Sequence, residues 1–196
     1  MRHAKSIRFS LALLSAASPA MADTGLYPEA APPDASFLRF VGFDAGEAVR
    51  FAGKRFKAPE KQSLPYVPVS AALLEGIAPG AFLTVVRDDA GQLQAINEST
   101  ARDPAKVHLF LINATSQNLD LRVAGSETVV IESTAAMQSG TRAVNPVNIG
   151  LSVVAAGSKT PLQTFQVDLR RGQNISFLAT SSGVQLIEHR FGPVAK

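Results

Sequence analysis

The clearest pattern in the chain is an alternation of apolar and polar residues between positions 141 and 179. It is sharpest over 147–153, which reads Val-Asn-Ile-Gly-Leu-Ser-Val, and it returns over 162–169 and 174–180. A period of two residues is typical of β-strands with one buried face. Short turns that contain Gly157 and Gly172 separate these segments. The pattern therefore predicts three strands in an antiparallel meander.

Most of the remaining chain follows the same pattern. Residues 35–43 are apolar on nearly both faces, which predicts a central strand, whereas prolines at 59, 65 and 68 allow only a short or edge strand nearby. We expect residues 133–140 to form a loop and 69–74 to be able to turn helical. The other expected strands are 48–51, 56–57, 82–87, 93–96, 107–113, 119–123, 127–132 and 184–190.

This density of short strands predicts an all-β protein made of two small antiparallel β-sandwich domains in tandem. Residues 35–97 form the first expected domain and 107–196 the second. The polar stretch 98–106 is the expected linker, with a long loop inside one sandwich as the alternative. Domains this small bury little surface on their own, so we expect them to pack on each other or on a partner.

The first 22 residues have the pattern of a secretory signal peptide. Arg2, Lys5 and Arg8 precede a short apolar stretch, and small residues around Ala22 mark a cleavage site. The apolar stretch is well short of the roughly 20 residues that cross a bilayer. We therefore expect export to the periplasm without membrane insertion of the mature chain, and a proline-rich extended arm over 23–34.

Removal of this leader changes the charge of the chain. The full sequence carries 19 basic and 16 acidic residues, and three of the basic ones lie in the leader, which leaves 16 of each. Nucleic-acid binding depends on excess positive charge, so no nucleic-acid partner is expected. The chain has no cysteine, which excludes disulfides and every catalytic or metal role of a thiol.

Few residues outside the leader are suited to catalysis or metal binding. The two remaining histidines, His108 and His189, lie in expected strands without the spacing of zinc ligands. No Gly-x-Ser-x-Gly motif occurs, and Asp88-Asp89, the one adjacent acidic pair, precedes a turn. We therefore expect no catalytic residue, metal or cofactor. A serine, a histidine and an acid converging in one pocket would contradict this.

Two parts of the sequence resemble one protein family. Gly25-Leu26-Tyr27-Pro28 with the strand at 36–41, and Arg142 to Leu151 with the turn at 169–173, are similar to segments of the AlgF family of periplasmic alginate O-acetylation accessory proteins. The resemblance covers about a third of the chain, in the right order. It implies two β-sandwich domains and a non-catalytic adaptor that is required for acetylation of an exopolysaccharide.

The same resemblance implies the partners. They are periplasmic polysaccharide O-acetyltransferases and a membrane-bound O-acyltransferase, with the polysaccharide itself as a further candidate. Arg142 and the Asn145-Pro146 corner are candidate partner-binding residues, and Tyr27 in the extended arm is another. A structural role for each remains open, because Pro146 presets a strand entry and Asn145 can cap a turn.

Two other functions remain open at this point. An acetyl carrier or transferase would need an exposed hydroxyl, for which Ser133 and Thr134 are the choices. A polysaccharide-binding module would need exposed aromatic rings, but the chain has no tryptophan and only two tyrosines, Tyr27 and Tyr66.

Overall fold

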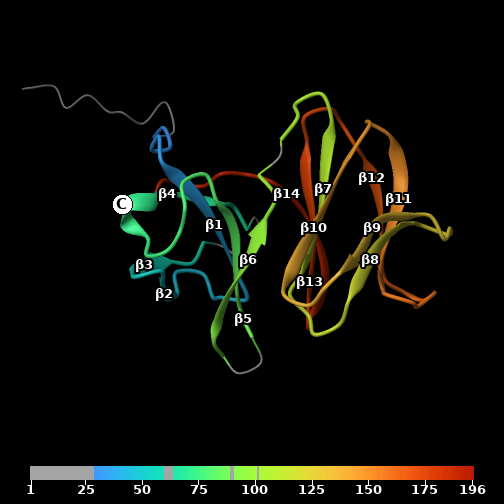
Figure 1. The fold of residues 1–196 in the computed structure, drawn as a ribbon, viewed down its shortest axis with the longest axis horizontal. Coiled ribbons are helices and arrows are strands. Elements are labelled where there is room, and N and C mark those ends of the chain that lie inside the picture. The colour runs from blue at the N-terminus through green and yellow to red at the C-terminus, as the bar shows by residue number, and fades with distance from the viewer. Residues whose placement is uncertain (1–28, 60–63, 89–90, 101) are drawn as a thin grey trace, which may run out of the picture.

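The computed structural model describes residues 29–59, 64–88, 91–100 and 102–196 (Figure 1). Over these residues the chain forms fourteen β-strands and one short 3-10 helix, η1 (Ala71–Leu73), without an α-helix. The all-β prediction is therefore confirmed. The expected signal peptide and residues 23–28 of the expected arm, with Tyr27, lie outside the described residues.

The N-terminal half consists of one four-stranded sheet, in the order β4-β1-β5-β6, and the hairpin β2-β3. Apolar residues on one face of the sheet, among them Leu38, Phe40 and Val85, pack against Val49 and Phe56 of the hairpin. The strands are β1 (Ala35–Val41), β2 (Ala48–Phe51), β3 (Lys54–Lys57), β4 (Val67–Ser70), β5 (Phe82–Arg87) and β6 (Leu93–Glu98).

The C-terminal half is a sandwich of two four-stranded sheets, in the orders β10-β7-β13-β14 and β12-β11-β8-β9. Leu109, Phe177, Leu121 and Val153 are among the buried residues of the core between these sheets. The strands are β7 (Val107–Asn113), β8 (Leu119–Val123), β9 (Val129–Thr134), β10 (Gln138–Val144), β11 (Asn148–Ala155), β12 (Pro161–Asp168), β13 (Asn174–Thr180) and β14 (Gly183–Glu188).

The two halves pack on each other, as expected for small sandwiches. The second apolar face of sheet β4-β1-β5-β6 contributes Val41 and Val86, and the outer face of sheet β10-β7-β13-β14 contributes Phe110, Ile112 and Leu178 to one shared core. This explains why strands such as β1 and β7 are apolar on both faces, since each is buried on both sides. We call this contact the inter-half interface.

Most strand pairs are antiparallel, but each half has one parallel pair at the centre of a sheet. β1 pairs with β5 and β7 pairs with β13 in parallel. The predicted meander is therefore wrong at its last step, because β13 leaves β12 and enters the other sheet. All the central residues of β13 are buried, and only a position between two strands, covered on both faces, provides that burial.

A further correction concerns β10, which the sequence placed partly in a loop. Its residues are small or polar and mostly exposed, so they show no alternation of apolar positions. Gly140 has a packing reason, because a Cβ there would lie 2.5 Å from the Ile131 side chain and 2.6 Å from Thr134 Oγ1. β10 is thus an edge strand, and its small residues are required by close packing against β9.

The C-terminal segment crosses back to the N-terminal half, where Figure 1 places the end of the chain near β4. The Gly192 amide donates to the Tyr66 carbonyl at 2.7 Å, and the Ala195 amide donates to the Pro68 carbonyl at 2.8 Å. These bonds cover an edge of β4 that would otherwise present unpaired backbone groups. The segment therefore connects both halves beyond the loop at 99–106.

Candidate functional site

A serine and a histidine meet at the inter-half interface. Ser176 lies on β13, and His189 follows β14; Ser176 Oγ and His189 Nε2 are 2.6 Å apart. Ser176 is fully buried. Since a Ser–His pair is the start of a hydrolase triad, the groups around it decide whether this contact is catalytic.

The neighbouring groups form a buried polar cluster that joins the two halves. Arg39 Nη2 lies 3.0 and 3.1 Å from the two carboxylate oxygens of Glu98, and 3.1 Å from Ser176 Oγ. The Tyr66 hydroxyl donates to Glu98 at 2.6 Å, and the Thr84 hydroxyl donates to it at 2.7 Å. We call these residues, together with His189, the interface cluster.

Burial determines the protonation of the cluster. Desolvation, reinforced by the nearby Arg39 and Arg102 guanidinium groups, lowers the pKa of His189 to about 2. Desolvation also raises the pKa of Tyr66 above its usual value, so its hydroxyl stays protonated. His189 is thus neutral at pH 7. Its Nε2 shares a hydrogen bond with the Ser176 hydroxyl, whose oxygen also accepts one from Arg39.

This arrangement does not match that of an acyl-transfer triad. The Glu98 carboxylate bonds to Arg39, Tyr66 and Thr84 and not to the histidine that it would have to orient. A positive guanidinium next to His189 opposes the imidazolium that a general base must become. The cluster is better suited to holding the two halves together, although Arg39 Nη1 has no hydrogen-bond partner among the described residues.

The other histidine also makes a structural contact. His108 is buried on β7, and its Nε2 accepts a hydrogen bond from the Asp103 amide at 2.7 Å. This bond fixes the loop that leads into β7. Within the described residues, no three or more His, Asp or Glu side chains are grouped in a way that could hold a metal ion.

Arg142, Asn145 and Pro146 lie together at the end of the C-terminal half. Arg142 is exposed near the end of β10, and Asn145 and Pro146 form the exposed connection to β11. Asn145 Oδ1 accepts a hydrogen bond from Lys106 Nζ at 2.8 Å. Part of the role of Asn145 is therefore to attach this connection to the loop before β7.

The turn at 169–173 meets the segment from Arg142 to Leu151 at this place, and both belong to the family resemblance. The Val147 amide donates to the Leu169 carbonyl at 3.2 Å, and the Leu169 amide donates back at 3.0 Å. The Gly172 amide donates to the Lys106 carbonyl at 2.8 Å. We call this surface, formed by 142–147, 169–173 and Lys106, the basic corner.

The basic corner combines positive charge with exposed apolar area. Arg142, Arg170 and Arg171 are exposed, and Val147 is 45% exposed. Arg170 is paired with Asp168 at 3.0 Å. Exposed arginines on the same surface as an exposed apolar side chain are a common composition for a protein-binding surface, where arginine is enriched.

The hydroxyls proposed for an acetyl carrier differ in exposure. Ser133 is exposed, and its amide donates to Asp120 Oδ1 at 2.7 Å. The expectation that Thr134 is exposed is wrong, because this residue is 4% exposed and faces the Gly140 backbone. Asp88 accepts hydrogen bonds from the Gln92 amide and from Gln94, while Asp89 lies outside the described residues.

Sequence reasoning missed the interface cluster, although one signal was present. Arg39 is the one charged residue inside a strand that is apolar on both faces, and such a residue needs a buried partner. Its partner, Glu98, was assigned to the linker, but it is the last residue of β6 and is 6% exposed. No local pattern connects residues that lie 59 positions apart.

Comparison with known proteins places this chain in a family. A family model described as "Alginate O-acetyl transferase AlgF" matches residues 70–176, more than half of the chain. The alginate biosynthesis protein AlgF of Pseudomonas putida is 27% identical over 192 residues, covering 92% of this chain and 89% of that protein. AlgF of Pseudomonas aeruginosa is 26% identical over 192 residues, covering 90% and 88%.

A solved structure of the C-terminal domain of AlgF from P. aeruginosa is 25% identical, with a TM-score of 0.36; the match covers 43% of this chain and 96% of that domain. Among the described residues, no helix is both long and apolar enough to cross a membrane. Because the family model matches more than half of the sequence, this chain belongs to the AlgF family.

Proposed function

We propose that the chain is a non-catalytic periplasmic adaptor that is required for O-acetylation of an alginate-like exopolysaccharide. Membership of a family whose description names alginate O-acetylation supports a role of this chain in that process. One structural observation supports the adaptor role. The two segments of the family resemblance in the C-terminal half, which are separated in sequence, form one exposed surface, the basic corner.

In this proposal, the basic corner docks a periplasmic polysaccharide O-acetyltransferase. The exposed arginines orient the partner and raise its association rate through charge. Val147 and Pro146 supply apolar contact area. A membrane-bound O-acyltransferase is the second partner. By holding both enzymes, the chain raises the effective concentration at which the acetyl group passes between them.

Replacing Arg142 and Asn145 together by alanine is expected to weaken binding of the purified periplasmic acetyltransferase by about tenfold or more, since truncated interface anchors typically cost this much. Binding should be measured by biolayer interferometry with the mature chain immobilised. The far-ultraviolet circular dichroism spectrum should stay unchanged, because Arg142 is exposed and Asn145 makes one surface hydrogen bond.

Arg55→Ala is the matched control, because it removes the same charge from an exposed position of β3 in the N-terminal hairpin. It should bind within about twofold of the wild type. If both variants weaken binding equally, the effect is one of net charge, and the basic corner is not the docking surface.

A further inference from the structure

The outer face of the hairpin β2-β3 is strongly basic. Val49 and Phe56 point into the core of the N-terminal half, so the alternate positions of the two strands lie on the other side. These positions carry exposed cations at Arg50, Arg55 and Lys57. Neither strand contains an acidic residue, and the three cationic side chains form no ion pair or hydrogen bond with other described residues. We call this surface the hairpin face.

The arrangement of these cations does not favour the stability of the hairpin. Arg50 and Arg55 lie directly opposite each other in the antiparallel pair, where Cβ atoms are about 4.5–5.5 Å apart and like charges are destabilising. Lys57 follows Arg55 by two residues, which adds a third charge about 7 Å further along the same face. Residues that break such a local rule often mark a functional site.

The acidic residues next to the hairpin do not neutralise this face. Glu47 precedes β2 but forms an ion pair with Arg87 of β5. Glu75 lies beside the turn at Gly53, and the described residues include no ion pair between Glu75 and any of the three cations. The free charge therefore favours an anionic ligand, because an arginine guanidinium can bind a phosphate or carboxylate group through two parallel N–H bonds.

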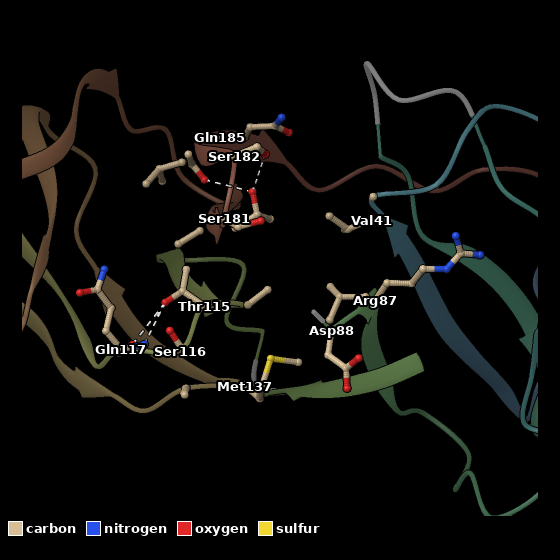
Figure 2. Close-up of a pocket in the computed structure, with 18 of the residues that line it drawn as sticks. Val41, Arg87, Asp88, Thr115, Ser116, Gln117, Met137, Ser181, Ser182 and Gln185 are labelled. Carbon is tan, nitrogen blue, oxygen red and sulfur yellow. Dashed lines mark hydrogen bonds between the residues drawn. The ribbon is translucent and has the colours of Figure 1, made fainter. Parts of the chain in front are cut away.

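A groove of about 960 Å³ between the two halves differs in this respect (Figure 2). Among its described lining residues, the charged ones are Arg87 and Asp88. Arg87 is paired with Glu47, and Asp88 accepts hydrogen bonds from Gln92 and Gln94. Charge therefore selects a class of ligand at the hairpin face but not at the groove.

The hairpin face carries charge without apolar or aromatic anchors. Ala48 is its fourth residue, whereas Phe51 and Phe56 pack on the core at the opposite side of the hairpin. A protein partner is usually bound through aromatic or apolar anchors, and a sugar ring through an aromatic ring. A surface of anionic lipid headgroups needs neither, because each lysine or arginine close to it adds to the attraction. The composition of the face therefore favours a membrane surface over a protein or a polysaccharide.

The position of the hairpin is compatible with contact to a membrane. The hairpin covers one face of sheet β4-β1-β5-β6, while the C-terminal half packs on the other face. Figure 1 shows β2 and β3 on the side of the N-terminal half that is away from the C-terminal half. A membrane at the hairpin face would therefore leave the C-terminal half, with the basic corner, on the far side from the lipid and accessible to a protein.

We propose that the hairpin face attaches the chain peripherally to a membrane that contains anionic phospholipids, through contacts of Arg50, Arg55 and Lys57 with lipid phosphate groups. The inference goes beyond the proposed adaptor function and does not depend on it. Attachment at this face concentrates the chain at the membrane, which is where the membrane-bound O-acyltransferase of the proposed function lies.

Flotation of the mature chain with lipid vesicles tests this inference. The wild type is expected to bind vesicles of phosphatidylethanolamine and phosphatidylglycerol but not vesicles of phosphatidylcholine, and to lose this binding as salt is added. Arg50→Gln with Arg55→Gln should weaken binding by about tenfold or more, since each cation near an anionic surface contributes about fivefold. This variant should be at least as stable as the wild type, because it removes two like charges that face each other.

Lys159→Gln with Arg190→Gln is the matched control, because it also removes two exposed positive charges, at positions outside the hairpin. This variant should bind the vesicles within about twofold of the wild type. Absence of vesicle binding by the wild type, or an equal loss in both double variants, overturns the inference. The adaptor function is unaffected by either result, because the experiment contains no acetyltransferase.

Two further results would replace the membrane by another ligand and also overturn the inference. Saturable binding of glycerol phosphate in calorimetry, without binding of vesicles, would assign a soluble phosphate ligand to the hairpin face. Weaker binding of the periplasmic acetyltransferase by Arg55→Ala, again without binding of vesicles, would assign an acidic protein surface to it.

Discussion

Replacing Arg39 by methionine is expected to lower the free energy of unfolding by about 3–5 kcal/mol, because it leaves the buried Glu98 carboxylate without a cation. Both side chains are fully buried in the interface cluster, at an N–O distance of 3.0 Å. Domains of this size are typically stable by only about 5–15 kcal/mol, so much of the stability would be lost. Urea unfolding followed by far-ultraviolet circular dichroism measures the effect.

The double variant Arg39→Met with Glu98→Gln is the control for this mechanism. It removes the unpaired charge but keeps one oxygen at the site. This oxygen can replace the Glu98 oxygen that accepts the hydrogen bond of Tyr66 or the one that accepts the hydrogen bond of Thr84, since the two hydroxyls donate to different oxygens. We expect it to recover at least about half of the loss. If the double variant is as unstable as the single one, the packing volume of Arg39 matters and the buried charge pair does not.

Stability is expected to fall by roughly 2 kcal/mol between pH 7 and pH 5 on account of His189 alone. The folded chain keeps this imidazole neutral down to a pKa of about 2, mainly through desolvation, whereas the unfolded chain takes up a proton near pH 6.5. The unfolded state therefore binds more protons below pH 6.5, and stability decreases with falling pH across that window. Urea unfolding at a series of pH values measures this slope.

His189→Gln provides the comparison, because its amide oxygen can accept the Ser176 hydroxyl but does not titrate. The difference in stability between wild type and variant should narrow as the pH falls from 7 to 5. His108→Gln removes an imidazole elsewhere in the chain. This variant should keep the fall in stability between pH 7 and pH 5 that His189 causes. A His189→Gln curve parallel to that of the wild type would mean that the pKa of His189 is not depressed.

The sequence predicted those strands well whose pattern of apolar residues depends only on which faces are buried. β1 was correctly placed at the centre of a sheet from its two apolar faces, and the short β4 next to the prolines was correctly placed at an edge. β10 was not predicted, because its small residues follow contacts with Ile131 and Thr134 that no local pattern shows. Likewise, the sequence did not predict the crossover from β12 to β13. β13 is buried on both faces, so its own residues do not show which of the two sheets it joins.

The functional surfaces were predictable only in part. Arg142, Asn145 and the turn at 169–173 stood out through a family resemblance, yet only the fold brings them into one corner. The groove between the two halves (Figure 2) had no sequence signal at all, because its serine, threonine and glutamine residues lie in the C-terminal half, mostly in turns, while its other wall comes from the N-terminal half. Such residues are common in turns, so the sequence does not show which of them line one surface. Only the packing of the two halves brings them together.

The most direct test of the adaptor role is native mass spectrometry of the mature chain with the purified periplasmic acetyltransferase and an activated acetyl donor. The account predicts a complex of the two proteins in which this chain keeps its unmodified mass. A mass increase of one acetyl group on this chain, without a stable complex, would contradict it and favour an acetyl carrier, for which Ser133 is the exposed candidate.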